Sequence, residues 1–511
     1  MRRVPLLSGS RIVHVPLADG DVVLAPPLPP THVVDVAAAV RDALRFPLDG
    51  RALADIVPRG GRVTVVVEPP SLPIPGAQLD PRPQALATVL GELSALGIAG
   101  DRQTILVAGG LARKLPHRDL ERLLPPPQAR EYRGRVLVHD AADPLLVPLD
   151  LGDGTRVAIE PAIVDTDLIV VVSSAETVLQ GGPAALLSAC DAETIRKSAA
   201  ADSLLQAAAT PAWRLALAVE RAVAARVPLV GVSLVLDHPR LTGRFRDYPH
   251  EPHSFQHVAR SPFRRIYSAL PASLRRGILR DLQRTIAATG AYAGTPSVAH
   301  AESLLRTVEL RGVPLAEPLD VLVVGIPWIS PYVPRELLNP ITSAAISLGL
   351  ALRLWRDAFP VRDGGTLIVV HSLTRNFAHG TQGPYRRLFD ALTSGTDVWS
   401  SERELSADAR ALEAYRAGHA CHPSLPYADW AGCQPALARL GAVIVAESRD
   451  SVAARALGLV PSHSIASALE MAHGLAGGRA RVGVLLAPPY APLLVGTSPL
   501  RDTSFEPARS S

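Results

Sequence analysis

Two polar segments in the second half of the chain, 371–385 and 415–423, combine histidine with hydroxyl, amide and guanidinium groups. The first follows a strongly apolar run, and polar residues at the end of a parallel strand are well placed to contact a ligand. Imidazole exchanges protons near neutral pH, which suits it to general acid–base catalysis. The sequence therefore predicts four candidate catalytic residues: His371, His379, His419 and His422. The alternative is that these loops are ordered and that their histidines cap helices or face solvent.

Candidate substrate-binding residues lie in the first of these segments and after apolar runs elsewhere in the chain. Hydroxyl and amide groups can donate hydrogen bonds to a small anion, and arginine can bind a carboxylate through two parallel bonds. We expect a small anionic ligand to contact Ser71, Arg113, Asn339, Thr342, Arg375, Asn376 and Tyr385.

A basic insert, 238–284, carries ten arginines and three acidic residues, whereas the whole chain has a formal net charge of only +4. His250, His253 and His257 share one face if this stretch is helical, and three imidazoles could hold a divalent metal. Pro252 is compatible with such a helix only in its first turn, which makes His250 a weak member of the set. The competing interpretation of the insert is a solvated face or a contact with a second copy or another protein. No helix-turn-helix, zinc-finger or RNA-binding motif accompanies the arginines, which argues against nucleic acid as the partner.

Alternating strands and helices must position these residues. Apolar runs rich in β-branched residues predict strands at 63–67, 105–108, 136–139, 168–173, 229–236, 321–325, 366–371, 443–446 and 482–487. Helical periodicity predicts helices at 83–96, 117–124, 212–225, 272–288, 341–358, 406–417 and 464–475. The alternation predicts an α/β fold of two domains, with mainly parallel sheets that face a central cleft. We place a first domain at 1–237, the insert at 238–298, a second domain at 299–495 and a flexible tail at 496–511.

Composition narrows the class of protein. The 511-residue chain contains no uninterrupted run of 18 apolar residues, so no membrane span and no membrane partner are predicted. Its three cysteines show no CxxC pair, which is typical of a reducing compartment. We therefore expect a cytoplasmic protein.

The order of several short motifs resembles that of the nickel-dependent lactate racemase family. They lie at 43–47, 57–60, 63–67, 71–75, 105–113, 163–174 and 181–182 in the first half, and at 319–327, 364–368 and 443–457 in the second. The resemblance implies an α/β fold and a racemase- or epimerase-type isomerase of a 2-hydroxy acid. It also implies the family's cofactor, a nickel-pincer nucleotide that is tethered through a lysine, ligated by histidine and active in hydride transfer.

Several positions depart from the family's motifs. Matched motif by motif, Leu72 stands where the family has arginine, and Ala112 and Val178 stand where it has two histidines. Ala184 replaces the lysine that forms the tether, and Ala199 replaces the histidine that ligates nickel. Alanine has neither a lone pair nor an amine, so it can neither ligate the metal nor form the tether.

The chain has only two lysines, Lys114 and Lys197, and each lies close to a position that departs from the family's motifs, Ala112 and Ala199 respectively. We predict a divergent lactate racemase-like protein that binds or converts a small hydroxy acid or related anion without the tethered nickel-pincer cofactor. Its own cofactor is unknown. One alternative is a true nickel-pincer 2-hydroxy-acid racemase or epimerase whose cofactor ligands lie at positions other than those matched above, with Lys114 or Lys197 as a candidate tether. The other is a non-catalytic interaction protein that docks through the basic insert, as a homo-oligomer or with another partner.

Overall fold

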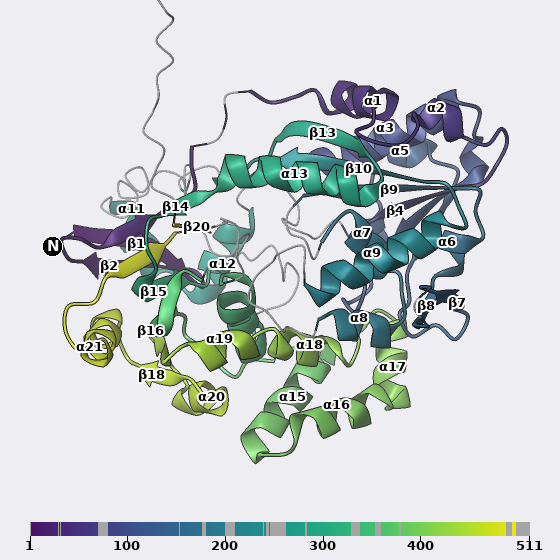
Figure 1. Cartoon of the computed structure of the whole chain (residues 1–511). Helices are drawn as coiled ribbons and strands as arrows, with labels where there is room; N and C mark the ends of the chain where they lie inside the picture. The colour runs from purple at the N-terminus through teal and green to yellow at the C-terminus, as the bar shows by residue number, and fades with distance from the viewer. Residues whose placement is uncertain are drawn as a thin grey trace, which may run out of the picture.

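The protein has two α/β units, each built on a six-stranded sheet, as the computed structural model shows (Figure 1). The structure describes residues 2–28, 30, 32–69, 80–152, 154–175, 180–199, 210–238, 240–241, 245, 262–281, 284–328, 338–352, 359–377, 380–486 and 493–496. The predicted α/β fold with two mainly parallel sheets is confirmed.

The first sheet has the strand order β13-β10-β9-β4-β5-β6. Its strands are β4 (Val63–Val67), β5 (Gln103–Val107), β6 (Arg135–Val138), β9 (Leu168–Ser174), β10 (Leu229–Leu236) and β13 (Ala288–Gly294). All neighbours are parallel except β10 and β13. The central strands β4 and β9 are buried along their whole length, as their unbroken apolar sequences predict.

Helices flank the first sheet on both faces (Figure 1). They are α1 (Val36–Arg45), α2 (Leu53–Ile56), α3 (Pro81–Ala95), α4 (His117–Leu120), α5 (Pro126–Glu131), α6 (Pro161–Val164), α7 (Pro183–Leu187), α8 (Ala192–Ser198), α9 (Pro211–Ala224) and α13 (Pro296–Arg311). A short hairpin, β7 (Val147–Asp150) and β8 (Arg156–Ile159), precedes α6. Proline begins α3, α9 and α13, because its missing N–H costs nothing in a first turn.

The second sheet has the order β18-β17-β16-β15-β19-β3, and every neighbouring pair is parallel. Its strands are β3 (Val22–Leu24), β15 (Leu319–Gly325), β16 (Val361–Val370), β17 (Ala442–Ala446), β18 (Val460–Ser462) and β19 (Val482–Leu485). Its helices are α14 (Pro340–Ala344), α15 (Gly383–Ser394), α16 (Val398–Ser406), α17 (Ala409–Arg416), α18 (Leu425–Ala431), α19 (Gln434–Arg439), α20 (Ser451–Ala456) and α21 (Ile465–Leu475). The strands β14 (Val313–Leu315) and β20 (Leu493–Val495) form a separate pair.

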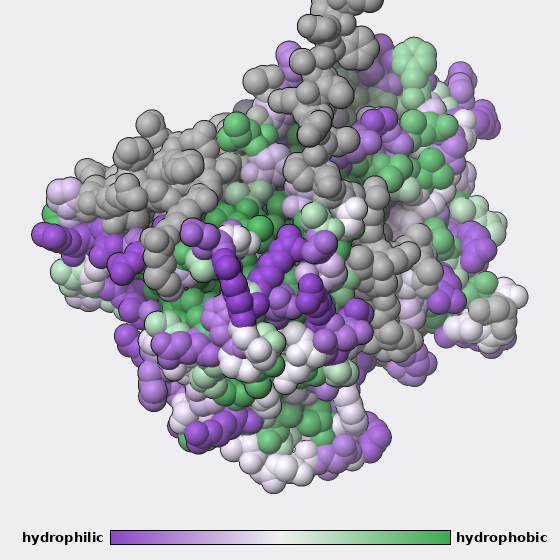
Figure 2. Space-filling model, turned by 60° about the vertical axis from the view of Figure 1, so that its left-hand side comes forward, coloured by the Kyte–Doolittle hydropathy of each residue, from purple (hydrophilic) through white to green (hydrophobic). Residues whose placement is uncertain are grey.

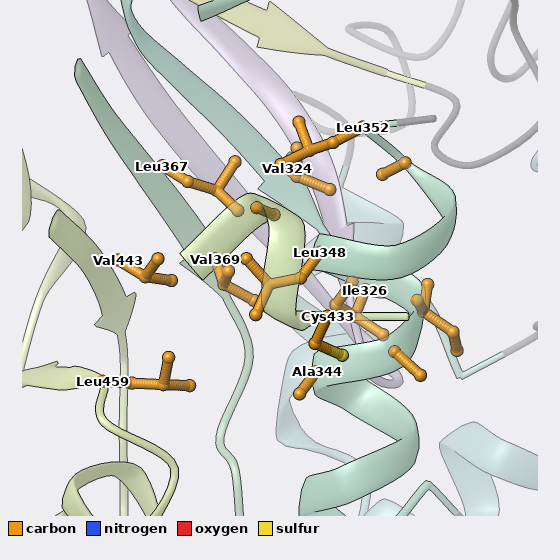
Figure 3. Close-up of a cluster of buried hydrophobic side chains, with 14 of the residues drawn as sticks. Val324, Ile326, Ala344, Leu348, Leu352, Leu367, Val369, Cys433, Val443 and Leu459 are labelled. Atoms are coloured by element: carbon orange, nitrogen blue, oxygen red, sulfur yellow. The ribbon is translucent and has the colours of Figure 1, made fainter. Parts of the chain in front are cut away.

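A large apolar core fixes helix α14 against this second sheet (Figure 3). The helix continues as a π-helix over Ala345–Leu350, and Ala344 and Leu348 face Ile326 and Val369 at the ends of β15 and β16. The first turn of α14 is thereby held at the carboxyl edge of the sheet.

The N-terminal segment belongs to the second sheet. The hairpin β1 (Arg2–Ser8) and β2 (Arg11–Leu17) packs on β15 and β16 through Leu6 and Val13, and β3 pairs with β19. The Gly9 N–H donates to Ile326 O at 2.7 Å. Conversely, β13 and α13 pack on the first sheet although the sequence placed them in the insert or the second domain. The division between the sheets therefore differs from the predicted boundaries at 237 and 298.

The described part of the basic insert docks on this hairpin. It contains β11 (Arg240–Leu241), α11 (Pro262–Ala269), α12 (Ala272–Asp281) and β12 (Arg284–Thr285). The buried Tyr267 hydroxyl donates to Ser10 O at 2.8 Å. The helix predicted over 272–288 is thus too long, because Arg284–Thr285 pairs with β11 as a strand.

In the described residues, no helix combines the length and the apolar character needed to cross a membrane. On the face shown in Figure 2, hydrophilic side chains are interspersed with hydrophobic ones. All three cysteines are buried and none forms a disulfide.

Candidate functional site

A pocket opens at the carboxyl ends of β4 and β9, beside the first turn of α3. Its apolar wall consists of Val67, Pro69, Pro83, Leu86, Leu123 and Val172. Its polar lining consists of Glu68, Asp80, Arg82, Ser173 and Ser174. A concave site with apolar walls and a few convergent polar groups at this edge of a parallel sheet is the usual place for a ligand in α/β proteins.

Asp80 and Arg82 form a tight ion pair in this pocket. The Asp80 carboxylate caps α3 by accepting the Arg82 N–H at 3.0 Å. The Arg82 guanidinium donates from Nε to both carboxylate oxygens, at 2.9 and 3.0 Å, and from Nη2 to Oδ2. The positive charge of the pocket is therefore already engaged by a carboxylate of the same chain.

The Gly181–Gly182 turn is hydrogen-bonded to two residues that line the pocket. The Gly181 N–H donates to Glu68 Oε1 at 2.8 Å, and the Gly182 N–H donates to Ser173 Oγ at 3.0 Å. Both glycines have positive φ, and a Cβ on Gly182 would lie 2.5 Å from His300 Cβ. Only glycine fits this turn, which explains the glycine pair without a role in ligand chemistry.

His300 is a buried imidazole that sequence reasoning missed. It lies on α13 against the glycine turn and stacks on Trp213 of α9, with ring centroids 6.1 Å apart. A single histidine in a helical stretch gives no signal of its position. It therefore becomes visible only when the fold brings α13 to the turn.

Both lysines of the chain are engaged in ion pairs. Lys114 Nζ lies 2.7 Å from Asp140 Oδ2 and donates to Arg416 O at 3.3 Å. Lys197 pairs with Glu193 at 2.7 Å, and its side chain is 70% exposed. Ala184, which the sequence motifs predict to stand in place of the family's lysine, is buried within α7.

Lys114 belongs to a contact between the two α/β units. The Tyr415 hydroxyl at the end of α17 donates to Gly110 O at 3.0 Å and accepts from the Ala141 N–H at 3.2 Å. Burial raises the pKa of Tyr415 far above its usual value, so the hydroxyl keeps its proton. On the same surface, the Arg196 guanidinium of α8 binds both carboxylate oxygens of Glu402 at 2.7 and 3.1 Å.

His422 lies inside this contact rather than in an open site. The backbone N–H of His422 donates to Leu111 O at 2.9 Å, and the imidazole ring lies edge-on to Tyr415, with ring centroids 5.1 Å apart. Burial lowers the pKa of His422 to about 4, although Asp140 acts in the opposite direction. Nδ1 accepts the Ser424 N–H at 3.2 Å, so the imidazole is neutral at pH 7.

The other predicted catalytic histidines lie apart. His371 follows β16, is buried, and accepts the Leu373 N–H on Nδ1 at 3.2 Å. Burial lowers the pKa of His371 to about 4, so the imidazole is neutral near pH 7 and only weakly basic there. His419 is exposed after α17, and His379 lies outside the described residues. Among the described residues, no hydrogen bond joins any two of these histidines.

Asn339 and Thr342 occupy the first turn of α14, beyond the carboxyl end of β15. Asn339 Oδ1 accepts the Thr342 N–H at 2.9 Å and caps the helix. Asn339 Nδ2, Thr342 Oγ1 and Ser343 Oγ are buried and have no hydrogen-bond partner. A buried polar atom without a partner costs about 1–3 kcal/mol, so three on one turn make this turn a candidate ligand site.

The remaining predicted binding residues are not gathered at this turn. The Tyr385 hydroxyl donates to Asp429 Oδ2 at 2.7 Å, and Arg375 pairs with Asp450 at 2.6 Å on the surface. Asn376 is exposed and Arg113 is half-buried. Ser71 lies outside the described residues, as do all three predicted metal ligands, His250, His253 and His257. The described part of the chain contains no group of three or more His, Cys, Asp or Glu side chains that could hold a metal ion.

Comparison with known proteins agrees with this architecture. Residues 9–197 match the lactate racemase N-terminal domain family. No curated protein matches the chain by sequence.

Among solved structures, the fold is similar to that of the lactate racemase apoprotein from Thermoanaerobacterium thermosaccharolyticum. The TM-score is 0.63 at 15% identity, and the match covers 96% of this chain and 100% of that one. A protein from Thermotoga maritima matches with a TM-score of 0.52 at 11% identity, covering 91% of this chain and 100% of that one. At these identities the comparisons establish a shared fold.

Proposed function

We propose that the protein is a divergent lactate racemase-like protein that binds or converts a small hydroxy acid or related anion without a tethered nickel-pincer cofactor. The observation that carries the proposal is the state of the two lysines. Each pairs with a carboxylate at 2.7 Å, and Ala184, which the motif order predicts to replace the family's tethering lysine, is buried. The residues present do not fit the cofactor, and no step is assigned to it.

The first turn of α14 supplies the groups that would bind the ligand. Asn339 Nδ2, Thr342 Oγ1 and Ser343 Oγ can donate hydrogen bonds to a carboxylate or a hydroxyl without adding charge. His371 follows the neighbouring strand β16 and leaves the sheet at the same edge. Because its Nδ1 accepts the Leu373 N–H, the neutral imidazole carries its proton on Nε2 and can donate a hydrogen bond to a ligand oxygen. If the protein is active, the expected reaction is a racemase- or epimerase-type isomerisation of a 2-hydroxy acid.

Two measurements test this proposal. Protein produced together with the enzymes that synthesise the cofactor is examined by intact mass and metal analysis, and the expected result is the unmodified mass without stoichiometric nickel. Thermal unfolding is then followed with D- and L-lactate. Stabilisation that is lost in Thr342→Val and kept in Thr88→Val, a buried threonine of α3, supports binding at α14. Equal stabilisation of both variants excludes this turn.

A second candidate is an interaction protein that docks through the basic insert. The helix α11 exposes Arg265 and Ile266, α12 exposes Leu274, and Ile266 and Leu274 are 63% and 55% exposed. Arginines flanked by exposed aliphatic side chains are typical of a contact surface. We expect the double variant Arg265→Gln, Arg276→Gln to lose retention on a heparin column. The control variant Arg386→Gln is expected to keep it. Unchanged retention of the double variant at low salt contradicts the docking role.

A further inference from the structure

The N-terminal hairpin carries positive charge on the side that meets the basic insert. Val13 and Val15 of β2 pack into the core of the second unit. Because side chains alternate along a strand, His14 lies on the opposite side of the hairpin, where α11 contacts β2 (Figure 1). Arg264 Nη1 of α11 lies 3.3 Å from each ring nitrogen of His14. The insert therefore brings a guanidinium directly against an imidazole.

A second guanidinium acts on the same imidazole. In the register of the hairpin, Arg3 faces Pro16 and Pro5 faces His14, so Arg3 is a diagonal neighbour of His14 on the same side. Burial lowers the pKa of His14, and the charges of Arg264 on α11 and Arg3 on β1 lower it further. The imidazole is therefore neutral at pH 7. Arg3, His14 and Arg264, which we call the hairpin cluster, together carry two positive charges.

No carboxylate of the described residues neutralises the hairpin cluster. Within the part of the chain that the structure describes, neither Arg3 nor Arg264 forms an ion pair, whereas Arg11 on the same hairpin pairs with Glu447 at 2.8 Å. Residues 242–261 of the insert contain three arginines and two acidic residues, so they add no net negative charge. Two like charges beside one imidazole repel each other, and an anion bound to both relieves that repulsion.

We infer that the hairpin cluster binds a small oxyanion that carries about two negative charges, such as a phosphate group. Guanidinium groups bind phosphate oxygens through paired hydrogen bonds, and a phosphate monoester has a charge of about −1.5 to −2 at pH 7, which matches two arginines. Such an anion offsets the charges that act on His14, so the pKa of His14 rises when the anion binds. The hairpin is a different site from the turn of α14, and the inference does not depend on the proposed function.

Inorganic phosphate and acetate are the probes that test the inference. Each is titrated into the full chain at pH 7 and constant ionic strength, and binding is measured by calorimetry. Phosphate is expected to bind at least about tenfold more tightly than acetate, because it carries more charge between the two guanidinium groups. Equal affinities overturn the inference, and so does the absence of phosphate binding.

The imidazole of His14 gives a second readout in the unmodified protein. Its NMR signal is identified by its absence in His14→Gln, and its titration is followed with and without phosphate. The pKa of His14 is expected to rise in saturating phosphate. An unchanged titration shows that phosphate binds elsewhere and overturns the inference.

A matched pair of double variants assigns phosphate binding to the hairpin cluster. Arg3→Gln, Arg264→Gln removes both charges and is expected to weaken phosphate binding by about tenfold or more. Arg41→Gln, Arg45→Gln removes two charges from exposed positions on α1 and is expected to leave the affinity unchanged. Equal affinities of the two double variants overturn the inference, and so does retention on heparin that needs Arg3 and Arg264 while free phosphate does not bind. If the first double variant does not fold, the two measurements on the unmodified protein remain decisive.

Discussion

Replacing the buried hydroxyl of Thr342 by a methyl group, Thr342→Val, is expected to stabilise the second α/β unit while weakening ligand binding. Thr342 is 2% exposed, its Oγ1 has no hydrogen-bond partner, and its backbone N–H keeps its bond to Asn339 in the variant. Valine has nearly the same shape as threonine. The substitution therefore removes an unsatisfied polar atom without opening a cavity.

The magnitude follows from the cost of an unsatisfied buried polar group. Removing that cost returns about 1–2 kcal/mol to the free energy of unfolding. For a unit of this size the gain corresponds to a rise of roughly 2–8 °C in the unfolding midpoint. The chain has two units and is not expected to unfold in one step, so calorimetry is used to resolve the transition of the second unit.

Thr88→Val is the matched control for this prediction. Thr88 is also buried in a helix, but its hydroxyl donates to Gln84 O at 2.8 Å, so the same substitution removes a bond and is expected to cost about 0.5–1.5 kcal/mol. If Thr342→Val lowers the midpoint as much as Thr88→Val does, the hydroxyl at 342 is satisfied in solution. The unpaired hydroxyl then no longer supports a ligand site at the turn of α14.

Three further predictions follow from the described contacts. His371 and His422 have a folded-state pKa of about 4 against an ordinary value of 6.5, so the unfolded chain binds more protons between these values. The stabilisation that comes from keeping these imidazoles neutral is fully present above about pH 6.5 and is lost as the pH drops towards 4, by about 3 kcal/mol of unfolding free energy for each residue. A urea-unfolding midpoint that does not change between pH 7 and 4.5 contradicts this prediction. Gly182→Ala places a Cβ 2.5 Å from a side chain of α13, whereas Gly60→Ala meets nothing within 4 Å, so the first is expected to cost at least about 1 kcal/mol more in the free energy of unfolding; equal costs refute the tight fit. Tyr415→Phe removes both hydrogen bonds of the hydroxyl, so faster amide exchange is expected in the loops after β5 and β6, with unchanged exchange in α21 as the control. Unchanged amide exchange in those loops would show that the hydroxyl does not hold the two units together.

Much of the fold is predictable from the sequence because its parallel strands are buried on both faces. Unbroken apolar runs such as Val63–Val67 are stable only when both faces of the strand are buried. All nine predicted strands are present, with ends that differ from the predicted ones by a few residues at most. The N-terminal hairpin was missed because its alternation is interrupted by Pro5 and Pro16. Its place beside β15 depends on contacts with residues more than 300 positions away.

The candidate site was less predictable than the fold. Loop histidines signal possible chemistry, yet burial decides what they can do, and His422 lies in the contact between the units. The pocket beside α3 arises from Glu68, Asp80 and Ser174, which come from three separate elements and show no shared motif. Asn339 and Thr342 were among the predicted binding residues, but their unpaired atoms could be recognised only in three dimensions.

The most direct test of the central proposal is the mass and metal content of protein made in cells that synthesise the nickel-pincer cofactor. A lactate racemase that takes up the cofactor is produced in the same cells as a positive control, and tryptic peptides that contain Lys114 and Lys197 are mapped. The account predicts the unmodified mass, two unmodified lysines and no stoichiometric nickel. Stoichiometric nickel together with an adduct on either lysine would contradict it.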